Sequence, residues 1–93
     1  METFVMDGSP CHIYFKNKTF IPEHQLFLQI KEALVDAGVK IGKAFMGPSE
    51  DLYNCEWKGK SFSLIYDIDY GPCLYVEDPE LRGLLLEQLA QHP

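Results

Sequence analysis

Acidic side chains gather in one short stretch of the chain, YDIDYGPCLYVEDPE at residues 66–80. The stretch holds five carboxylates and no Lys or Arg. Carboxylates at this density can coordinate a cation or attract a basic protein. Asp78 and Glu80 have structural explanations, because an Asp before Pro79 is typical of a helix cap and a Glu favours the first helical turn. The remaining acids, Asp67, Asp69 and Glu77, are the candidate contact residues.

The spacing of Asp67 and Asp69 partly matches a calcium-binding loop. That template has a Gly at its sixth position and an acid at its twelfth, and it lies between two helices. Here the sixth position is Pro72, the twelfth is the helix-capping Asp78, and strand-like sequence flanks the loop. A helix–loop–helix calcium site is therefore not expected. A cation site built from Asp67, Asp69 and Glu77 in another geometry is the third functional hypothesis.

Two tyrosines lie in the same stretch, Tyr70 at the tip of an expected turn and Tyr75 on the outward side of an expected strand. A Tyr among carboxylates is a frequent protein-contact residue, because it combines apolar area with a polar tip. Chance placement explains two surface tyrosines equally well, and solvated charges that discourage edge-to-edge aggregation explain the acids. The predicted binding residues are Asp67, Asp69, Tyr70, Tyr75 and Glu77.

The Cys and His residues give only weak indications of a catalytic or metal-binding site. Cys11 and His12 are adjacent, so on a strand their side chains point to opposite faces. Cys73 lies among acids, which should raise the pKa of its thiol and make it unreactive. The chain contains no CxxC, no HExxH and no Gly-rich phosphate loop, so neither a metal site nor a cofactor is expected. A small enzyme or ligand-binding domain with His12 or Cys11 in a pocket is the second hypothesis.

The negative charge of the chain is unevenly spread. The 93 residues carry a formal net charge of −6. Residues 61–93 hold one Arg against six acids, a net charge of −5. A negative surface repels phosphate backbones, so nucleic-acid binding is not expected. The same charge favours a protein partner with a basic surface.

A cytoplasmic location is predicted from the cysteines and from the distribution of apolar residues. The three cysteines are an odd number at wide spacing, which argues against a disulfide framework and favours reduced thiols. No apolar run reaches the roughly 18 residues of a membrane span. The first residues lack the basic and apolar regions of a secretory signal. Neither membrane insertion nor secretion is therefore expected.

Helical periodicity marks two segments. PEHQLFLQIKEALVDAG at residues 22–38 predicts a helix in which Pro22 takes the first position and Gly38 the left-handed residue at the end. Its apolar face comprises Leu26, Ile30, Ala33, Leu34 and Ala37. A second helix ends the chain, with Asp78 as its cap. The apolar stripe predicted for it comprises Leu81, Leu84, Leu85 and Leu89.

Strand patterns fill most of the remaining sequence. Residues 3–6 and 11–16 predict two short strands around a turn. Val39, Ile41 and Phe45 then alternate as one side of a strand, which Gly42 weakens or interrupts with a bulge.

The clearest hairpin is YNCEWKGKSFSLIYDID at residues 53–69. A type II′ turn with Gly59 and Lys60 at its centre would place Trp57 opposite Phe62. This register gathers the large apolar residues on one side and the polar residues on the other, and a slip by one residue would mix them.

A second turn follows at residues 69–72, DYGP. A loop formed by residues 70–72 would place Asp67 opposite Tyr75 and leave the acids on the outer side. A four-residue loop would reverse the two faces, so the register of this strand pair stays open. Ile65 breaks the alternation with either loop, which indicates that the outer side is partly covered.

The predicted order is β(β)-α-β-β-β-β-α, and it favours a single α+β domain over residues 1–93. We expect a two-layer sandwich with a mainly antiparallel sheet of about four to six strands and both helices on one face. The leading functional hypothesis is a small acidic cytoplasmic protein without catalytic activity. It would bind another protein, as an adaptor, inhibitor or immunity-type module, through an acidic tyrosine-containing surface, and self-association is a further option.

Overall fold

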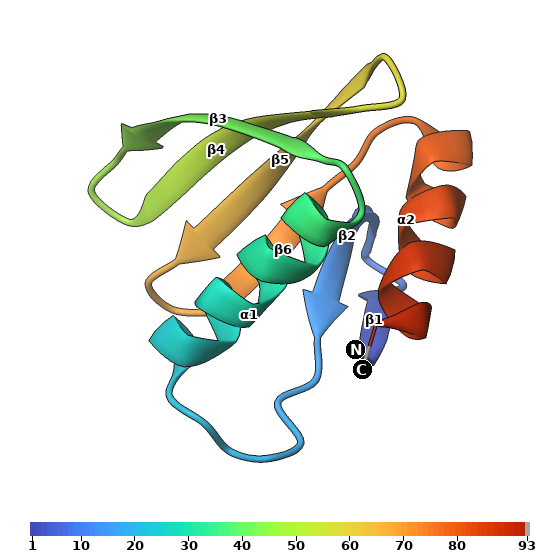
Figure 1. The fold of residues 1–93 in the computed structure, drawn as a ribbon. Coiled ribbons are helices and arrows are strands. Elements are labelled where there is room, and N and C mark those ends of the chain that lie inside the picture. The colour runs from blue at the N-terminus through green and yellow to red at the C-terminus, as the bar shows by residue number, and fades with distance from the viewer. Residues whose placement is uncertain (93) are drawn as a thin grey trace.

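The computed structural model describes residues 1–92, and they form an antiparallel sheet with two helices (Figure 1). The elements are β1 (Thr3–Met6), β2 (Ser9–Phe15), α1 (Glu23–Asp36), β3 (Lys40–Met46), β4 (Glu50–Trp57), β5 (Lys60–Asp67), β6 (Gly71–Tyr75) and α2 (Pro79–Gln91). The six strands lie in the order β1-β2-β6-β5-β4-β3. Both helices pack on one face of the sheet. The α+β fold predicted from the sequence is confirmed.

A pairing between strands that are far apart in the sequence completes the sheet. β2 pairs with β6, which places His12 opposite Tyr75 and Tyr14 opposite Cys73. The β1–β2 hairpin is thereby added to the meander that β3, β4, β5 and β6 form. α2 packs over β1 and β2, whereas α1 packs over β6 and β3 (Figure 1).

One apolar core fills the space between the sheet and the helices. Its helical members are Leu26, Phe27, Ile30, Ala33, Leu34, Leu81, Leu85 and Leu89. Its strand members are Ile13, Phe15, Cys55, Trp57, Phe62, Leu64 and Leu74, and Val76 follows β6. The stripe predicted for α2 is wrong at Leu84, which is 36% exposed, because Leu86 packs against the core from the other side of the helix.

The ends of both helices follow from local chemistry. Gly38 has a φ of 97°, so it is the left-handed residue predicted after α1. Pro22 lies one residue before the first helical residue and not at the predicted position. Asp78 caps α2 as expected, because its carboxylate accepts hydrogen bonds from the backbone N–H groups of Glu80 and Leu81.

The β4–β5 hairpin has the predicted faces but a different turn. Lys58 and Gly59 both have positive φ, 53° and 77°, so the turn is of type I′ and not type II′. Trp57 therefore lies opposite Lys60, and Cys55 lies opposite Phe62. The register differs from the prediction by two residues, and because side chains alternate with a period of two, every residue keeps its predicted face.

The register of β5 and β6, left open by the sequence, differs from the one that a loop of residues 70–72 would give. Asp67 pairs with Gly71 and not with Tyr75, because the connection consists of residues 68–70. Ser63 is the residue opposite Tyr75. The shift is again an even number of residues, so Leu74 faces the core as predicted and Cys73 faces outward.

A bulge in β3 changes the face of Phe45. The pairing of β3 with β4 shifts between Ile41 and Ala44, on either side of Gly42. Ile41 faces the core, as predicted, but Phe45 pairs with Leu52 on the opposite side of the sheet. The expectation that these two β3 residues share one face is therefore wrong, because an extra residue in a strand inverts the alternation after it.

Candidate functional site

The face of the sheet opposite the helices carries a row of apolar side chains. The strand register places these side chains directly opposite one another across all six strands. In strand order, the row comprises Phe4, Tyr14, Cys73, Ile65, Leu52 and Phe45. Side chains directly opposite each other in an antiparallel pair have Cβ atoms about 5 Å apart, so the row is continuous. We call these six residues the apolar row, and this side of the sheet the open face.

The centre of the apolar row is buried although neither helix lies on it. Cys73 is 5% exposed and Ile65 is 8% exposed, yet neither belongs to the core beneath the helices. Their neighbours in the row therefore shield them from solvent. The ends of the row are open, because Phe4 is 38% exposed and Phe45 is 60% exposed. The row thus has a closed centre between two accessible aromatic rings.

Aromatic rings gather at the β1–β2–β6 end of the open face. The ring of Tyr14 stacks on Phe4 with centroids 5.5 Å apart, and it lies 5.8 Å from the imidazole of His12. That imidazole meets Tyr75 edge-on at 4.9 Å. The carboxylate of Glu77 raises the pKa of the Tyr75 hydroxyl, so this Tyr stays protonated at neutral pH. The open face therefore presents packed aromatic rings with polar tips on this side.

Acidic side chains border the apolar row at the β5–β6 turn. Asp67 lies directly opposite Glu50 on the open face. Burial, and after it the negative charges of Asp67 and Glu50, raise the pKa of the Cys73 thiol to about 11. These two carboxylates therefore lie near the centre of the row, and the thiol is protonated at neutral pH. We call Glu50, Asp67 and Asp69 the acidic end.

Asp67 also has a structural role in the turn. Its Oδ1 accepts hydrogen bonds from the backbone N–H groups of Asp69 at 2.7 Å and Tyr70 at 3.0 Å. An Asp that bonds the backbone two or three residues ahead stabilises a turn. Asp69 and Tyr70 are thereby held at the tip, where Tyr70 is 78% exposed.

The five predicted binding residues fall into two groups. Asp67, Asp69 and Tyr70 lie together at the β5–β6 turn. Tyr75 ends β6, four residues beyond the Gly71 that pairs with Asp67, and Glu77 follows two residues later. At about 3.3 Å per residue, Tyr75 and Glu77 lie about 13 Å and about 20 Å from that turn. The predicted residues therefore lie in two separate groups, and their role in binding stays a prediction.

The residues of the second hypothesis lie on opposite sides of the sheet. The thiol of Cys11 lies on the helix side, where the Nη1 of Arg82 is 3.7 Å from its Sγ. The same guanidinium donates to the carbonyl of Val76 at 2.9 Å. The imidazole of His12 lies on the open face between Tyr14 and Tyr75. Cys11 and His12 therefore do not form a nucleophile–base pair in this structure.

The residues of the third hypothesis also lie apart, because Glu77 is at the far end of β6 from Asp67 and Asp69. Within residues 1–92, no three His, Cys, Asp or Glu side chains are arranged to hold a metal ion. All three cysteines are free, and Cys55 is buried in the core, where burial raises the pKa of its thiol to about 11.

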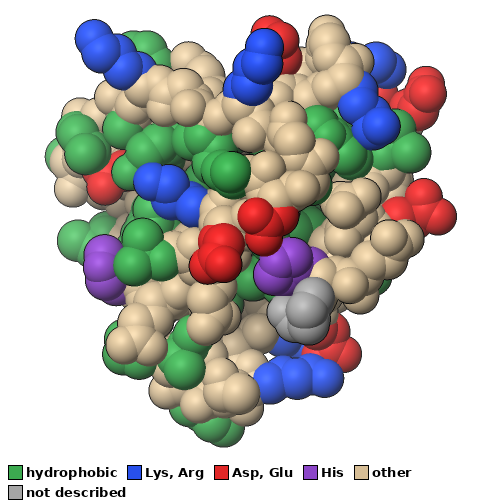
Figure 2. Space-filling view, in the orientation of Figure 1, with side chains coloured by type: hydrophobic (Ala, Val, Ile, Leu, Met, Phe, Trp, Pro, Cys, Tyr) green, Lys and Arg blue, Asp and Glu red, His purple; other side chains and the backbone are tan. Residues whose placement is uncertain are grey.

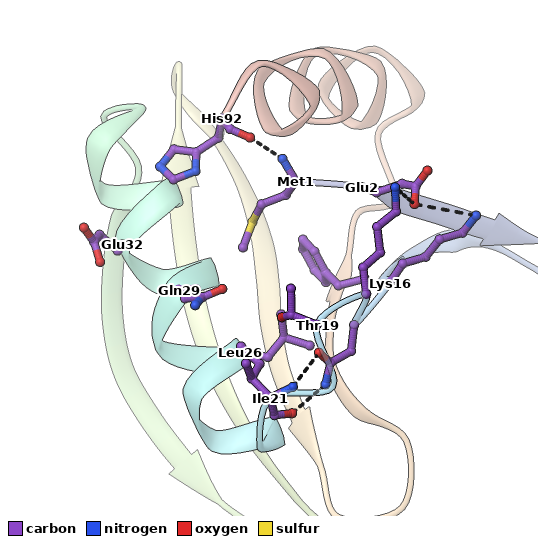
Figure 3. Close-up of a pocket in the computed structure, with 12 residues that line it drawn as sticks. Met1, Glu2, Lys16, Thr19, Ile21, Leu26, Gln29, Glu32 and His92 are labelled. Atoms are coloured by element: carbon purple, nitrogen blue, oxygen red, sulfur yellow. Dashed lines mark hydrogen bonds and ion pairs between the residues drawn. The ribbon is translucent and has the colours of Figure 1, made fainter.

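A cavity of about 310 Å³ opens between α1, the segment after β2 and the two ends of the described chain (Figure 3). Apolar side chains of Ile21 and Leu26 line it beside the polar Gln29 and Glu32. The ammonium of Lys18 already pairs with Glu2 at 2.9 Å. The amide of Asn17 closes the adjoining loop through two hydrogen bonds with the backbone of Ile21. The lining of this cavity is therefore partly apolar and partly polar, and it includes the Lys18–Glu2 ion pair.

Sequence reasoning missed most of the apolar row. Tyr75 was predicted on the outer side, and the position of Ile65 indicated a covered patch there. Phe45 was missed because the bulge in β3 inverts its faces, and Leu52 was missed because the predicted hairpin begins one residue later, at Tyr53. Phe4 and Tyr14 were missed because the pairing of β2 with β6 has no local signal.

Comparison of the chain with protein-family models, with curated proteins and with solved structures gives no match. Neither helix within residues 1–92 has the length and apolar character needed to cross a membrane.

Proposed function

We propose that this chain is a non-catalytic protein-binding module and that its docking surface is the open face. The observation that carries the proposal is the apolar row, which crosses all six strands with no helix over it and is bordered by the acidic end. A partner that fits this surface has an apolar centre and Lys or Arg side chains to one side. Protein interfaces commonly combine a buried apolar and aromatic core with a polar rim.

Charge and size both support a basic protein as the occupant. Glu50 and Asp67 face each other on adjacent strands, an arrangement of like charges that costs stability within the sheet. A cationic side chain from a partner would relieve that repulsion. At about 4.8 Å between strands, the sheet is about 24 Å wide. A standard interface buries about 800 Å² per partner, a patch about 28 Å across, so the two widths are comparable.

The β3 edge of the sheet argues against binding through an added strand. β3 is an edge strand that carries Lys40 and Lys43 and is broken by the bulge at Gly42. Lysines and bulges on an edge hinder pairing with another strand. Self-association through β3 is therefore disfavoured, and net negative charge disfavours the stacking of two open faces.

The test uses two substitutions that add the same charge to residues of matched exposure. Phe45→Lys places an ammonium at the open end of the apolar row, where the native ring is 60% exposed. Val35→Lys places one on α1, where the native side chain is 58% exposed. Wild-type and variant proteins are immobilised, and proteins retained from the source cell are compared at low and at physiological salt.

We expect one or more basic proteins to bind the wild type and the Val35→Lys variant and to be lost from the Phe45→Lys variant. Retention should weaken as salt rises, because charge attraction mainly accelerates association and is screened by ions. Retention by Phe45→Lys together with loss from Val35→Lys would contradict the proposal. Sedimentation of the pure protein as a dimer that Phe45→Lys disrupts would instead identify a second copy as the occupant.

A further inference from the structure

A second cavity, on the helix side of the sheet, is walled by aromatic rings. It has a volume of about 420 Å³ and lies between α1 and the strands β4 and β5. Hydrophobic side chains gather on the left of this face in Figure 2, and a Lys or Arg side chain lies among them. The residues that line the cavity are His24, Phe27, Leu28, Lys31, Asp51, Tyr53 and Tyr66.

The sequence positions of these residues explain why they converge. The four from α1, starting at His24, are spaced as i, i+3, i+4 and i+7, so they form one stripe of the helix. Asp51 and Tyr53 alternate along β4 and therefore share a side, and Tyr66 is the β5 residue opposite Asp51. The stripe of α1 thus faces two strands that supply two rings and a carboxylate.

Three rings form the floor and walls of this cavity. The centroid of Phe27 lies 4.7 Å from that of Tyr66 and 5.5 Å from that of Tyr53. Phe27 is buried, whereas the two tyrosines are half-buried and so remain accessible from solvent. We call Phe27, Tyr53 and Tyr66 the aromatic box.

The box already holds a cation from the chain itself. The ammonium of Lys31 lies 5.1 Å from the ring centre of Tyr53 and 5.6 Å from that of Phe27. A cation within about 6 Å of a ring centre is attracted by the negative potential of the ring face. The box is therefore shaped to receive an ammonium over two of its rings.

Carboxylates add to this preference for positive charge. Asp51 lines the cavity, and the carboxylate of Glu23 adjoins Tyr66, whose pKa is raised by burial first and by Glu23 second. Rings and carboxylates together recognise organic cations that carry little hydration, such as methylated ammonium groups.

We infer that the aromatic box binds an alkylammonium group of a ligand, with Lys31 as the internal group that the ligand displaces. The ligand is a methylated amine, either as a small molecule or as the side chain of a methylated lysine. This site is distinct from the open face, because it lies on the other side of the sheet, and its test requires no protein partner.

The test is an NMR titration of the ring protons of Tyr53 and Tyr66 in the full chain. Choline is the cationic probe, and 3,3-dimethylbutan-1-ol, its uncharged carbon analogue, is the matched control. Acetylated trimethyl-lysine methylamide is titrated in parallel, so that the stronger binder identifies the source of the group. We expect saturable shifts with the cations and not with the alcohol.

Two pairs of variants separate recognition from general electrostatics. Lys31→Ala should tighten choline binding roughly two- to fivefold, because the competing ammonium is removed. Lys43→Ala, an exposed lysine on β3 outside the cavity, should leave the affinity within twofold. Asp51→Asn should weaken binding more than Glu56→Gln, which removes an equal charge from the opposite side of β4.

Equal binding of choline and the alcohol would overturn the inference, as would weaker binding after Lys31→Ala. Absence of saturable shifts at Tyr53 and Tyr66 with either cation would also overturn it. None of these results bears on docking at the open face, so the two proposals fail separately.

Discussion

At the scale of single residues, one carboxylate combines a structural and a surface role. Asp67 was predicted as a contact residue, and the structure shows that its Oδ1 also bonds two backbone N–H groups of the β5–β6 turn. A carboxylate and a side-chain amide can both accept those bonds, but an apolar side chain cannot. Substitutions at this position can therefore remove the charge and either keep or remove the hydrogen bonds.

Asp67→Asn should change the free energy of unfolding by less than about 0.5 kcal/mol, because the amide oxygen can replace the carboxylate oxygen in the turn. Asp67→Ala should cost about 1 kcal/mol, because the two N–H groups lose their acceptor. Urea denaturation of both variants measures this difference. Equal stability of the two variants would show that the hydrogen bonds of Asp67 do not stabilise the turn.

The buried thiols predict a loss of stability in alkali. The pKa values of Cys55 and Cys73 rise from 9.0 in the unfolded reference to about 11 in the fold. Above about pH 9 the unfolded chain therefore releases protons that the folded chain retains, and the free energy of unfolding falls until about pH 11. Below about pH 9 both states keep these protons, so neither thiol contributes to pH dependence there.

Cys73→Ala should make this alkaline decline shallower. The fall in the free energy of unfolding between about pH 9 and about pH 11 should shrink by up to about 3 kcal/mol, the contribution of one thiol. Denaturant midpoints measured from pH 7 to pH 11 provide the comparison, and Cys11→Ala is the control because its thiol is not buried. A decline of unchanged slope in Cys73→Ala would contradict the assignment of this thiol to the buried centre of the apolar row.

At the scale of elements, the sequence predicted which face of the sheet a residue occupies better than which residue lies opposite it. Both hairpins pair with registers that differ from the prediction, yet Trp57, Phe62 and Leu74 all face the core as expected. The hydrophobic alternation determines the face of a residue, whereas turn geometry determines which residue lies opposite. The turn at Lys58 could not be predicted because it requires a positive φ at a residue other than Gly.

Trp57 joins the β4–β5 hairpin to the end of α1. Its side chain is buried, and its Nε1 donates to the carbonyl of Ala37 at 3.1 Å. Trp57→Ala should lower the free energy of unfolding by about 3–5 kcal/mol, through lost burial and an unpaired carbonyl. Trp57→Phe should cost less, because most of the apolar contact remains. A loss below about 1 kcal/mol for the Ala variant, measured by chemical denaturation, would contradict the packing described here.

Gly42 is required where the bulge brings two backbones together. A Cβ at this position would lie 2.9 Å from the carbonyl oxygen of Asn54, which is closer than carbon and oxygen can pack. Gly42→Ala should therefore destabilise the protein by about 1–3 kcal/mol and loosen β3. Gly83→Ala is the control, because open space surrounds that helical position and Ala should stabilise α2 by up to about 1 kcal/mol. Thermal unfolding of both variants distinguishes a local clash at Gly42 from a general preference for Ala.

At the scale of the whole molecule, the two faces of the sheet carry different kinds of surface. The helices bury one face and form the core, while the opposite face carries the apolar row with the acidic end beside it. The α+β class and both helices were predictable because helical periodicity and caps are local signals. The open face was not predictable from the sequence, because it depends on the pairing of β2 with β6 and on an extra residue in β3. Long-range pairing and bulges leave no periodic trace in a sequence.

The most direct test of docking at the open face is photo-crosslinking in the source cell at two positions of matched exposure. A photoreactive phenylalanine replaces Phe45 on the open face, 60% exposed, or Val35 on α1, 58% exposed. We expect a crosslinked product of one defined mass, with another protein, from position 45 and none of that mass from position 35. A crosslinked product from position 35, in cells that give none from position 45, would contradict docking at the open face.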